Sequence, residues 1–461
     1  MIISSINFNP IIVNAETTGE ILETWDISKT TDDSVTATLT DDGVFTISGT
    51  GAMKDFTSSS VPWADILDSI KVGVIEDGIT NIGNYTFYKC INLESVSIPS
   101  SITLIGEGAF QYNESLTSVD IPSSVDTIKD NAFANMTGIT SIVVPDSVTT
   151  LGNYVFRNNK SLTSAVLPST ITTIPMYTFQ NCENLTDVEL PSGLISIGFG
   201  AFKNNSAMTS ITIPDTVTTI KGYAFEYSGL TSVDIPDSVT SIETKAFANI
   251  NNLTSIVLPI NPTAGALDNL TNLETVRLGE RVTDIISGTL GPSTKITDVY
   301  IEGESTTISD GALAKTVTIH GVIGSASHNY ALTNGYAFKS IDGEPLDPIV
   351  AIEDKEYSKI SGVEPSWLFN LGDVATDVEV YVGDKKLDKS NYVTTTNTIK
   401  INGEYLKSLD EGTYEIQFKF NDTKNTNVAN SISIIDGLPT NIINTYNMGN
   451  SVNIINGYLT S

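Results

Sequence analysis

The sequence predicts a mainly β protein, with a right-handed solenoid of 23-residue repeats followed by an antiparallel β-sandwich. Three residue types recur every 23 positions, with one step of 22, over eight repeats: an aromatic, an aliphatic residue and a proline. After residue 343 this period gives way to an alternation of apolar and polar residues. Of the 461 residues 40% are hydrophobic and only 17% are charged, which excludes a disordered chain.

Residues 1–15 are predicted to be the remnant of a signal peptide. They are apolar and end in Val13-Asn14-Ala15, the small-x-small pattern of a signal-peptidase site. No basic residue precedes Lys29, so a longer signal peptide, a misassigned start and an ordinary N-terminal strand all stay open. Residues 16–68 are predicted to cap the solenoid, with Trp63 in the core of this cap.

Three columns in phase define the repeat region. The aromatic column is Phe87, Phe110, Phe133, Phe156, Phe179, Phe202, Phe225 and Phe247. The aliphatic column is Leu93, Leu116, Ile139, Leu162, Leu185, Met208, Leu230 and Leu253. The proline column is Pro99, Pro122, Pro145, Pro168, Pro191, Pro214, Pro236 and Pro259. One repeat cannot close a core, so the columns must be buried by stacking.

The chemistry of one repeat predicts its shape. Val119 and Ile121 alternate with a polar residue and are followed by Pro122, which cannot donate to a ladder, so a short strand ends there. Val125 and Ile128 mark a second short extended segment, and Phe133 is the large wedge. Stacked repeats then form a parallel ladder with a rise of roughly 4.8 Å per repeat.

The pattern L-x-x-V-x-I-P-x-x-V-x-x-I-G-x-x-A-F-x-x-C/N resembles the BspA-like (Treponema-type) leucine-rich repeats of bacterial surface proteins. The resemblance implies a leucine-rich repeat domain at 69–343, degenerate after Pro259 and closed by a terminal repeat with a short helix near Ala326–Leu332. The segment 45–56 and Pro62-Trp63 resemble the family's N-terminal lead-in. The glycine that follows the second segment is replaced in four repeats, where local turns can differ: Lys129, Pro175, Lys221 and Glu243.

The two cysteines, Cys90 and Cys182, occupy the same repeat position four repeats apart. That separation is about 19 Å along the axis, which excludes a disulfide. The resemblance implies that this slot faces inward, and the same column holds Asn113, Asn159 and Asn205. We therefore expect two free, buried thiols.

Residues 344–436 are predicted to form the β-sandwich and 437–461 a tail. Tyr414, Ile416, Phe418 and Phe420 alternate with polar residues. Asn391-Tyr392, Ile399-Lys400-Ile401, Tyr405-Leu406 and Gly412-Thr413-Tyr414 make this region similar to the X2-type immunoglobulin-like (Ig-like) module of bacterial wall-associated and polysaccharide-degrading proteins. The resemblance implies either a spacer or a carbohydrate binder.

Residues that flank the core positions on the strands should face outward and form an extended binding surface. The alternative is that these side chains are only solvated strand formers. Trp367 is the candidate for stacking on a sugar, and it carries the carbohydrate hypothesis for the sandwich. The predicted binding surface comprises Ser118, Asp120, Ser141, Val143, Ser164, Val166, Asp187, Glu189, Ser210, Thr212, Ser232 and Asp234.

Composition argues against several function classes. With 24 basic and 54 acidic residues the net charge is −30, so nucleic acid is repelled. No apolar run is long enough to span a membrane. Asp187 and Glu189 share one strand on an open sheet, and only His320 and His328 are available for triad or metal chemistry. We expect no enzyme activity, no cofactor and no metal.

Two hypotheses follow. The first is an exported, adhesin-like bacterial protein, secreted or on the cell surface and expected to be a monomer, that presents the concave repeat face to a host or extracellular-matrix protein. The alternative is a carbohydrate-binding accessory protein of the cell wall or of a polysaccharide-degrading system, acting through the Ig-like domain. The predicted face holds four carboxylates and no base, so its partner should be neutral or basic.

Overall fold

The computed structural model describes a mainly β chain that divides into two compact units. They are Met1–Val282 with Ser287–Ile296, and Thr283–Ile286 with Thr297–Ser461. The described residues are 19–288, 290, 295–341, 349–353, 355–358, 365–370, 377–394, 398–421, 427–435, 444–448 and 451–453. The predicted signal-peptide remnant and most of the predicted tail lie outside these residues, and the predicted boundary at 343 stays a prediction.

The N-terminal cap is a sheet with the strand order β1-β2-β3-β4-β6, in which β1, β2 and β3 are antiparallel and β4 begins the parallel stack. Trp63 is only 1% exposed and packs against Trp25, Phe45 and Phe56, which confirms its predicted place in the cap. The elements are β1 (Ile21–Asp26), β2 (Ser34–Thr40), β3 (Val44–Thr50), the 3₁₀ helix η1 (Ala64–Ser69), β4 (Val72–Ile75) and β6 (Ser95–Ser97).

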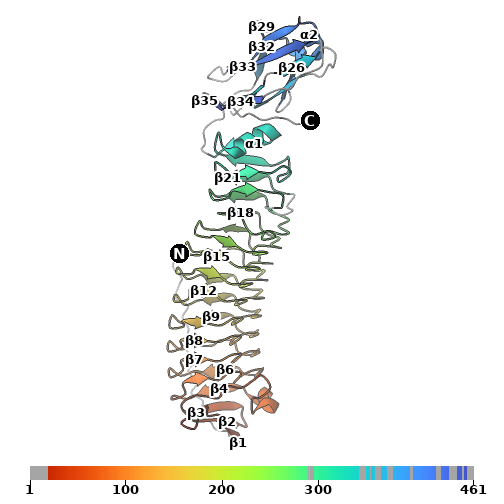
Figure 1. Ribbon diagram of the computed structural model, residues 1–461. Helices are drawn as coiled ribbons and strands as arrows, with labels where there is room; N and C mark the ends of the chain where they lie inside the picture. Colours follow the sequence, from red (N-terminus) through yellow and green to blue (C-terminus); the bar gives the residue numbers. More distant parts are fainter. Residues whose placement is uncertain are drawn as a thin grey trace. The chain divides into compact units, whose positions relative to one another are not determined.

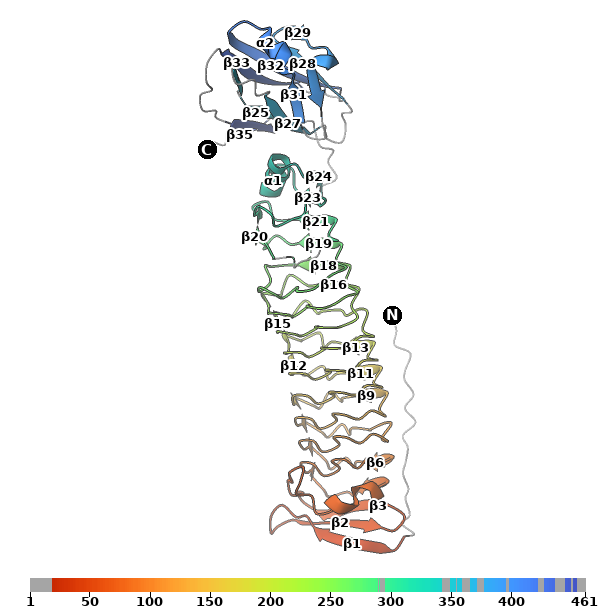
Figure 2. The same cartoon turned by 90° about the vertical axis from the view of Figure 1, so that its right-hand side faces the viewer.

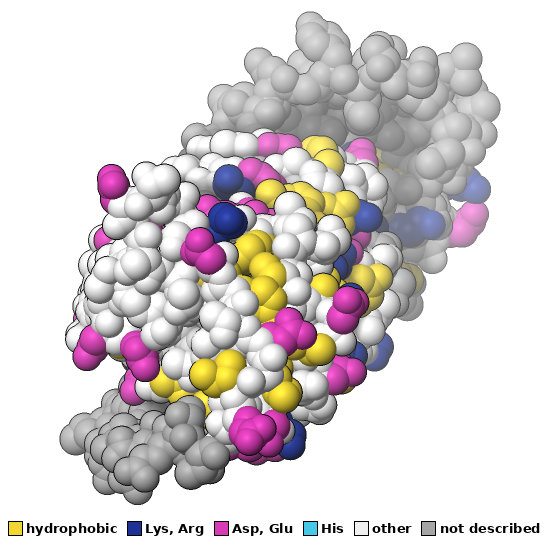
Figure 3. Space-filling view, turned by 90° about the horizontal axis from the view of Figure 1, so that it is seen from below, with side chains coloured by type: hydrophobic (Ala, Val, Ile, Leu, Met, Phe, Trp, Pro, Cys, Tyr) yellow, Lys and Arg dark blue, Asp and Glu magenta, His cyan; other side chains and the backbone are white. Residues whose placement is uncertain are grey.

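The N-terminal end is acidic, because residues 1–69 hold 2 basic and 11 acidic residues. Figure 3 looks onto this end and shows acidic side chains dispersed among uncharged ones, with few basic side chains. Because the acidic side chains are dispersed and surrounded by water of high dielectric constant, their mutual repulsion is weak. The excess of acidic over basic residues therefore does not form a dense anionic patch.

Beyond the cap the first unit is a stack of coils, most of which carry two short strands (Figures 1 and 2). The first strand of the coil forms two parallel ladders, β9-β11-β13 and β16-β18-β19. The residues 118–120 and 210–212 form no strand, so the predicted ladder is interrupted at these two coils. The strands are β9 (Ser141–Val143), β11 (Ser164–Val166), β13 (Asp187–Glu189), β16 (Ser232–Asp234), β18 (Ser255–Leu258) and β19 (Thr275–Leu278).

The second strand of each coil forms two further parallel ladders, which we call together the second ladder: β5-β7-β8-β10 and β12-β14-β15-β17. Residues in register repeat the same types, as in Ile105 and Ile128 or Ile197 and Ile220. The strands are β5 (Asn81–Ile82), β7 (Leu104–Ile105), β8 (Thr127–Ile128), β10 (Thr150–Leu151), β12 (Thr173–Ile174), β14 (Ser196–Ile197), β15 (Thr219–Ile220) and β17 (Ser241–Ile242).

The aromatic column forms the centre of the core. All eight phenylalanines from Phe87 to Phe247 are fully buried, and neighbouring rings stack with centroids 5.2–6.0 Å apart. Each ring contributes a large apolar area and a favourable ring contact to two coils at once. The prediction that Phe133 and its equivalents are the large buried side chains of the repeat is therefore confirmed.

In the second unit the last coils end in a helical cap. The helix α1 begins after Ser325, whose Oγ accepts a hydrogen bond from His328 N, and it ends at Gly335 in the left-handed conformation with φ 69°. The helix predicted near Ala326–Leu332 is confirmed. The elements are β20 (Asp284–Ile285), β21 (Asp298–Ile301), β22 (Thr307–Ile308), β23 (Thr318–Gly321), α1 (Ala326–Asn334) and β24 (Ala337–Ser340).

The C-terminal region has two sheets, β26-β33-β32-β28-β29 and β30-β31-β27-β25-β34-β35, which supply one hydrophobic cluster as in a β-sandwich. Pairing is antiparallel except for β26, which runs parallel to β33. The elements are β25 (Ile349–Glu353), β26 (Lys355–Ser358), β27 (Ser366–Asn370), β28 (Val378–Val382), β29 (Lys385–Lys386), η2 (Lys389–Asn391), β30 (Tyr392–Thr394), β31 (Thr398–Ile401), α2 (Gly403–Lys407), β32 (Gly412–Phe420), β33 (Asn427–Ile435), β34 (Asn444–Met448) and β35 (Ser451–Asn453).

We predict that Phe156→Ala lowers the free energy of unfolding by about 3–5 kcal/mol, because it opens a cavity between two coils. Urea denaturation followed by circular dichroism measures this. The control is Val143→Ala, a solvent-facing change for which we expect a shift of less than about 0.5 kcal/mol. Equal effects of the two changes would contradict the central role of the aromatic column.

Candidate functional site

The outward side chains of the first strands, and of the equivalent residues in the two coils that lack this strand, form a surface that we call the strand face. It is made of the twelve residues from Ser118 to Asp234 that the sequence predicts. On β9, β11 and β13 the parallel register aligns them in two rows. Ser141 and Ser164 lie beside Asp187, and Val143 and Val166 lie beside Glu189. The structure thus brings six of the twelve residues together in one patch.

The central apolar spot of this patch is solvent-exposed. Val143 is 39% and Val166 42% exposed, whereas Ile142 and Ala165 between the rows are buried in the core. The alternation follows from the two-residue period of a strand. Two neighbouring exposed valines on a solvated sheet offer a small apolar anchor for a partner.

The remaining predicted residues are exposed but more dispersed. Ser118, Asp120, Ser210 and Thr212 lie in the two coils where the ladder is interrupted. Ser232 and Asp234 lie on β16, in register with Ser255 and Val257 of β18. The predicted surface is therefore segmented, and only the β9–β13 part has a regular geometry.

The threonine hydroxyls before the first strands make hydrogen bonds between coils, whereas the serine hydroxyls on these strands do not. Threonines just before the first strands donate to carbonyls of the preceding coil, as in Thr163 Oγ1 to Thr140 O at 2.9 Å and Thr186 Oγ1 to Thr163 O at 3.2 Å. The serine hydroxyls of Ser141, Ser164 and Ser232 have no hydrogen-bond partner among the described residues. The threonines stabilise the stack, and the serines are available to another molecule.

Asp187 and Glu189 do not form the enclosed arrangement that glycoside hydrolysis needs. Both are exposed on β13, and neither lines the pocket described below. General acid catalysis requires a carboxyl group whose surroundings keep it protonated. Within the described residues, no group of three or more His, Cys, Asp or Glu side chains is placed to hold a metal ion.

Trp367 is not a sugar platform, so that prediction is wrong. The side chain is 0% exposed and packs against Phe418 in the core of the sandwich, with ring centroids 5.6 Å apart. A buried indole cannot stack on a ligand. It sits on β27 opposite Ile399 of β31, where a large apolar side chain fills the space between the sheets.

The two histidines have packing roles in the terminal cap. His320 bonds to Asp298 at 2.7 Å and stacks on Tyr300, and this bond holds the pKa of Asp298 below its usual value. His328 is 1% exposed, and its Nδ1 accepts a hydrogen bond from Gly324 N at 2.9 Å. Burial lowers the pKa of His328 from 6.5 to about 4, so the neutral ring is the stable form.

Cys90 and Cys182 are free and fully buried, as predicted. Cys182 Sγ lies 3.1 Å from Phe156 O, and Asn159 in the same column bonds Phe133 O through Nδ2, so the slot does face backbone groups of the turn. Burial raises the pKa of both thiols, that of Cys182 to about 12. Neither thiol has the exposure or low pKa of a reactive cysteine.

The turn side of the solenoid, between the second strand and the next first strand, carries two features that the sequence interpretation missed. An asparagine ladder runs through Asn135, Asn158, Asn181 and Asn204, each amide donating to the preceding one at 2.6–2.8 Å. These asparagines have φ of 60–62°, a conformation that asparagine tolerates better than most residues. The 23-residue recurrence of asparagine itself could have revealed them.

The second feature is a partly exposed aromatic row on the same turn side. Tyr154 stacks on Tyr177 at 5.2 Å, followed by Phe199 at 5.4 Å and Tyr223 at 5.0 Å. Lys203 and Lys245 lie over the Tyr223 ring. The basic side chains of this acidic chain therefore gather beside aromatic rings here.

The family described as BspA type leucine rich repeat region (6 copies) matches residues 67–186, 172–264 and 218–342, which together span more than half of the chain. A leucine-rich repeat protein from Bacteroides ovatus has a similar structure, with a TM-score of 0.50 and 19% identity over 66% of this chain and 88% of that chain. Among curated proteins none matches this sequence.

Two further solved structures are similar at lower TM-scores. A leucine rich cell surface protein from Faecalibacterium prausnitzii has a TM-score of 0.38 and 23% identity, over 67% of this chain and 97% of that chain. The pneumococcal vaccine antigen PcpA has a TM-score of 0.34 and 16% identity, over 68% of this chain and 98% of that chain.

We predict that both thiols of the native protein are unreactive toward a thiol reagent such as 5,5′-dithiobis(2-nitrobenzoate) at pH 8. Burial and the raised pKa leave almost no accessible thiolate. After unfolding in guanidinium both should react, giving two equivalents per chain. Rapid labelling of the folded protein would contradict the buried slot.

We predict that the terminal cap loses stability as the pH falls from about 6.5 toward about 4. The folded-state pKa of His328 lies below its unfolded value, so the unfolded chain binds the extra proton in this window. The loss is on the order of 3 kcal/mol. Hydrogen exchange of residues 318–341 measures this loss of stability. In the variant His328→Gln only the pH dependence that comes from carboxylates should remain.

Proposed function

Because the chain belongs to the BspA-type leucine-rich repeat family, we propose that it is an exported, non-catalytic and adhesin-like binding protein. It presents the strand face to a host or extracellular-matrix protein. Repeat solenoids offer such extended surfaces without a deep pocket. Export is supported by the small-x-small pattern at residues 13–15. Within the described part of the chain, no helix has the length and apolarity needed to cross a bilayer.

The observation that carries the proposal is the contrast between the two kinds of hydroxyl column. Threonine hydroxyls beside the strands are used to join the coils, whereas Ser141 and Ser164 leave theirs to solvent. A side chain chosen only for stacking gains nothing from an unpaired hydroxyl. Free hydroxyls around two exposed valines give a polar rim around an apolar centre, the usual anatomy of a protein interface.

The charges of the strand face indicate the kind of partner. Asp120, Asp187, Glu189 and Asp234 are exposed, and the twelve residues include no base. A neutral or basic protein surface complements this face, and an acidic one is repelled. Because the four carboxylates are spread over several coils, binding should depend only modestly on salt.

The alternative function, carbohydrate binding through the C-terminal domain, has no observation in its favour. Its one candidate residue, Trp367, is buried. The X2-type identity of this domain, its use as a spacer and the monomeric state remain predictions from the sequence.

We predict that Val143→Ser with Val166→Ser weakens binding to the partner at least tenfold, because both changes remove exposed apolar contact area at the centre of the patch. Binding is measured by biolayer interferometry against a panel of immobilised matrix proteins. The matched control is Ile195→Ser, which alters a side chain 43% exposed immediately before β14. Equal weakening by the control, or no effect of the double variant, would contradict the proposal.

We also predict that removing residues 344–461 leaves this binding unchanged within about twofold, because the strand face lies in the first unit. The same panel measures it, with circular dichroism as the check on folding. Loss of binding by a folded truncated protein would favour the C-terminal domain instead.

A further inference from the structure

The second ladder opens at one coil. β10 is the last strand of one group and β12 the first of the next, and the two do not pair. On the strand face of the same coils, β9 and β11 remain in register. The coils are therefore held together on one face and separated on the other.

Pro175 removes one of the hydrogen bonds that would close the ladder at this coil. In neighbouring coils the residue that follows the second strand donates its N–H to a carbonyl one coil earlier, as in Gly152 N to Ile128 O at 2.8 Å and Gly198 N to Ile174 O at 2.9 Å. Proline has no N–H, so residue 175 cannot make the equivalent bond to Leu151 O.

The chain contains its own controls for this explanation. Lys129, Lys221 and Glu243 also replace the glycine at this position, yet each still donates the ladder bond, at 2.9, 3.0 and 3.0 Å. A side chain at the position is thus compatible with a closed ladder. Of the four residues that replace the glycine only Pro175 lacks the N–H, so the missing donor and not an added side chain distinguishes the coil that opens.

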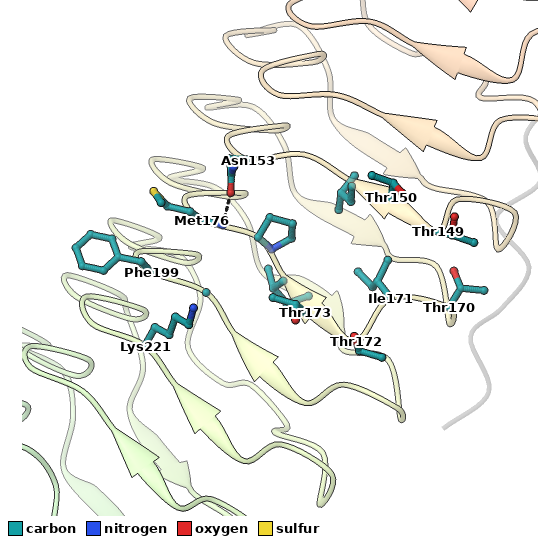
Figure 4. A pocket seen from close by; sticks show the side chains of 14 residues that line it. Thr149, Thr150, Asn153, Thr170, Ile171, Thr172, Thr173, Met176, Phe199 and Lys221 are labelled. Atoms are coloured by element: carbon teal, nitrogen blue, oxygen red, sulfur yellow. Dashed lines mark hydrogen bonds between the residues drawn. The ribbon is translucent and has the colours of Figure 1, made fainter.

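The opening is a pocket of about 430 Å³, within the range of roughly 300–1,000 Å³ that is usual for ligand sites. Figure 4 shows threonines on one side of it and Met176, Phe199 and Lys221 on the other. The hydroxyls of Thr150, Thr172 and Thr173 have no hydrogen-bond partner among the described residues. None of the residues given as lining the pocket is acidic.

Phe199 and Lys221 are suited to contact a ligand. The Phe199 ring is half-buried and is held between Tyr177 and Tyr223, with centroids 5.4 and 5.0 Å away. Lys203 and Lys245 already lie over Tyr223, whereas the ammonium group of Lys221 has no ion pair or ring contact among the described residues. A fixed aromatic ring, free hydroxyls and one free cation therefore surround the pocket.

We propose that this pocket binds a pyranose ring of a glycan. The apolar C–H face of a pyranose matches the Phe199 ring, and its equatorial hydroxyls match the unpaired threonine hydroxyls at the opposite wall. Lys221 binds a hydroxyl or, in an acidic sugar, a carboxylate. The site is on the second ladder, and its lining includes none of the strand-face residues.

The full chain is titrated by isothermal calorimetry and saturation-transfer NMR with two neutral sugars, cellotriose and maltotriose, and two acidic ones, trigalacturonate and 3′-sialyllactose. We expect at least one to bind with a Kd of about 0.1–1 mM. Phe199→Ala should weaken binding at least tenfold. Pro175→Gly should do the same while raising the Tm, because it restores the ladder bond and closes the pocket.

Matched variants separate this site from other surfaces. Tyr85→Ala changes a turn-side aromatic where the ladder is closed, and Val143→Ser with Val166→Ser changes the strand face, so both should keep the sugar affinity within twofold. Lys221→Met should weaken the acidic sugars more than the neutral ones, because the ammonium group pairs with a carboxylate more strongly than with a hydroxyl. The proposal is overturned if no sugar binds at 5 mM, or if binding survives Pro175→Gly or Phe199→Ala in folded protein.

Discussion

The structure depends on backbone hydrogen bonds that run from each coil to the next. In a coil of 23 residues only a few positions can reach the preceding coil, and the N–H after the second strand is one of them, as in Lys129 N to Ile105 O. A buried backbone group without a partner is costly, so coils that stack closely supply these donors at the same repeat positions. This requirement explains why the repeat length stays close to 23 residues and why a proline at this position differs from a lysine, which keeps the donor.

The side chains of the interior follow from the same stacking. Phe133 can lie 5.5 Å from Phe110 and 6.0 Å from Phe156 because the backbone ladders hold the coils at a uniform spacing. Asn159 satisfies backbone groups of the turn from inside the core, and Cys182 occupies the same place with its thiol. The interior thus tolerates little variation, whereas the outward positions are free to differ between coils.

The two outer faces use this freedom differently. On the strand face the outward serines and valines are not needed for stacking, which leaves a shallow surface suited to a flat partner such as a protein. On the second ladder the coils are equally regular except at Pro175, where a ladder donor is missing and a hollow lies beside Phe199. A surface and a pocket on one solenoid can therefore serve two ligands without sharing residues.

The sequence by itself determined the repeat, its buried columns, the outward direction of Val143 and Val166, the terminal helix and the free thiols, because a strict period ties each residue to one position on the coil. It did not place Trp367, because alternation in a sandwich strand shows that two faces exist but not which one is covered. Nor did it show the pocket at Pro175, although the proline was visible as a departure from the pattern. The tertiary structure decided both, since burial and an open ladder depend on what packs against a residue from another coil or sheet.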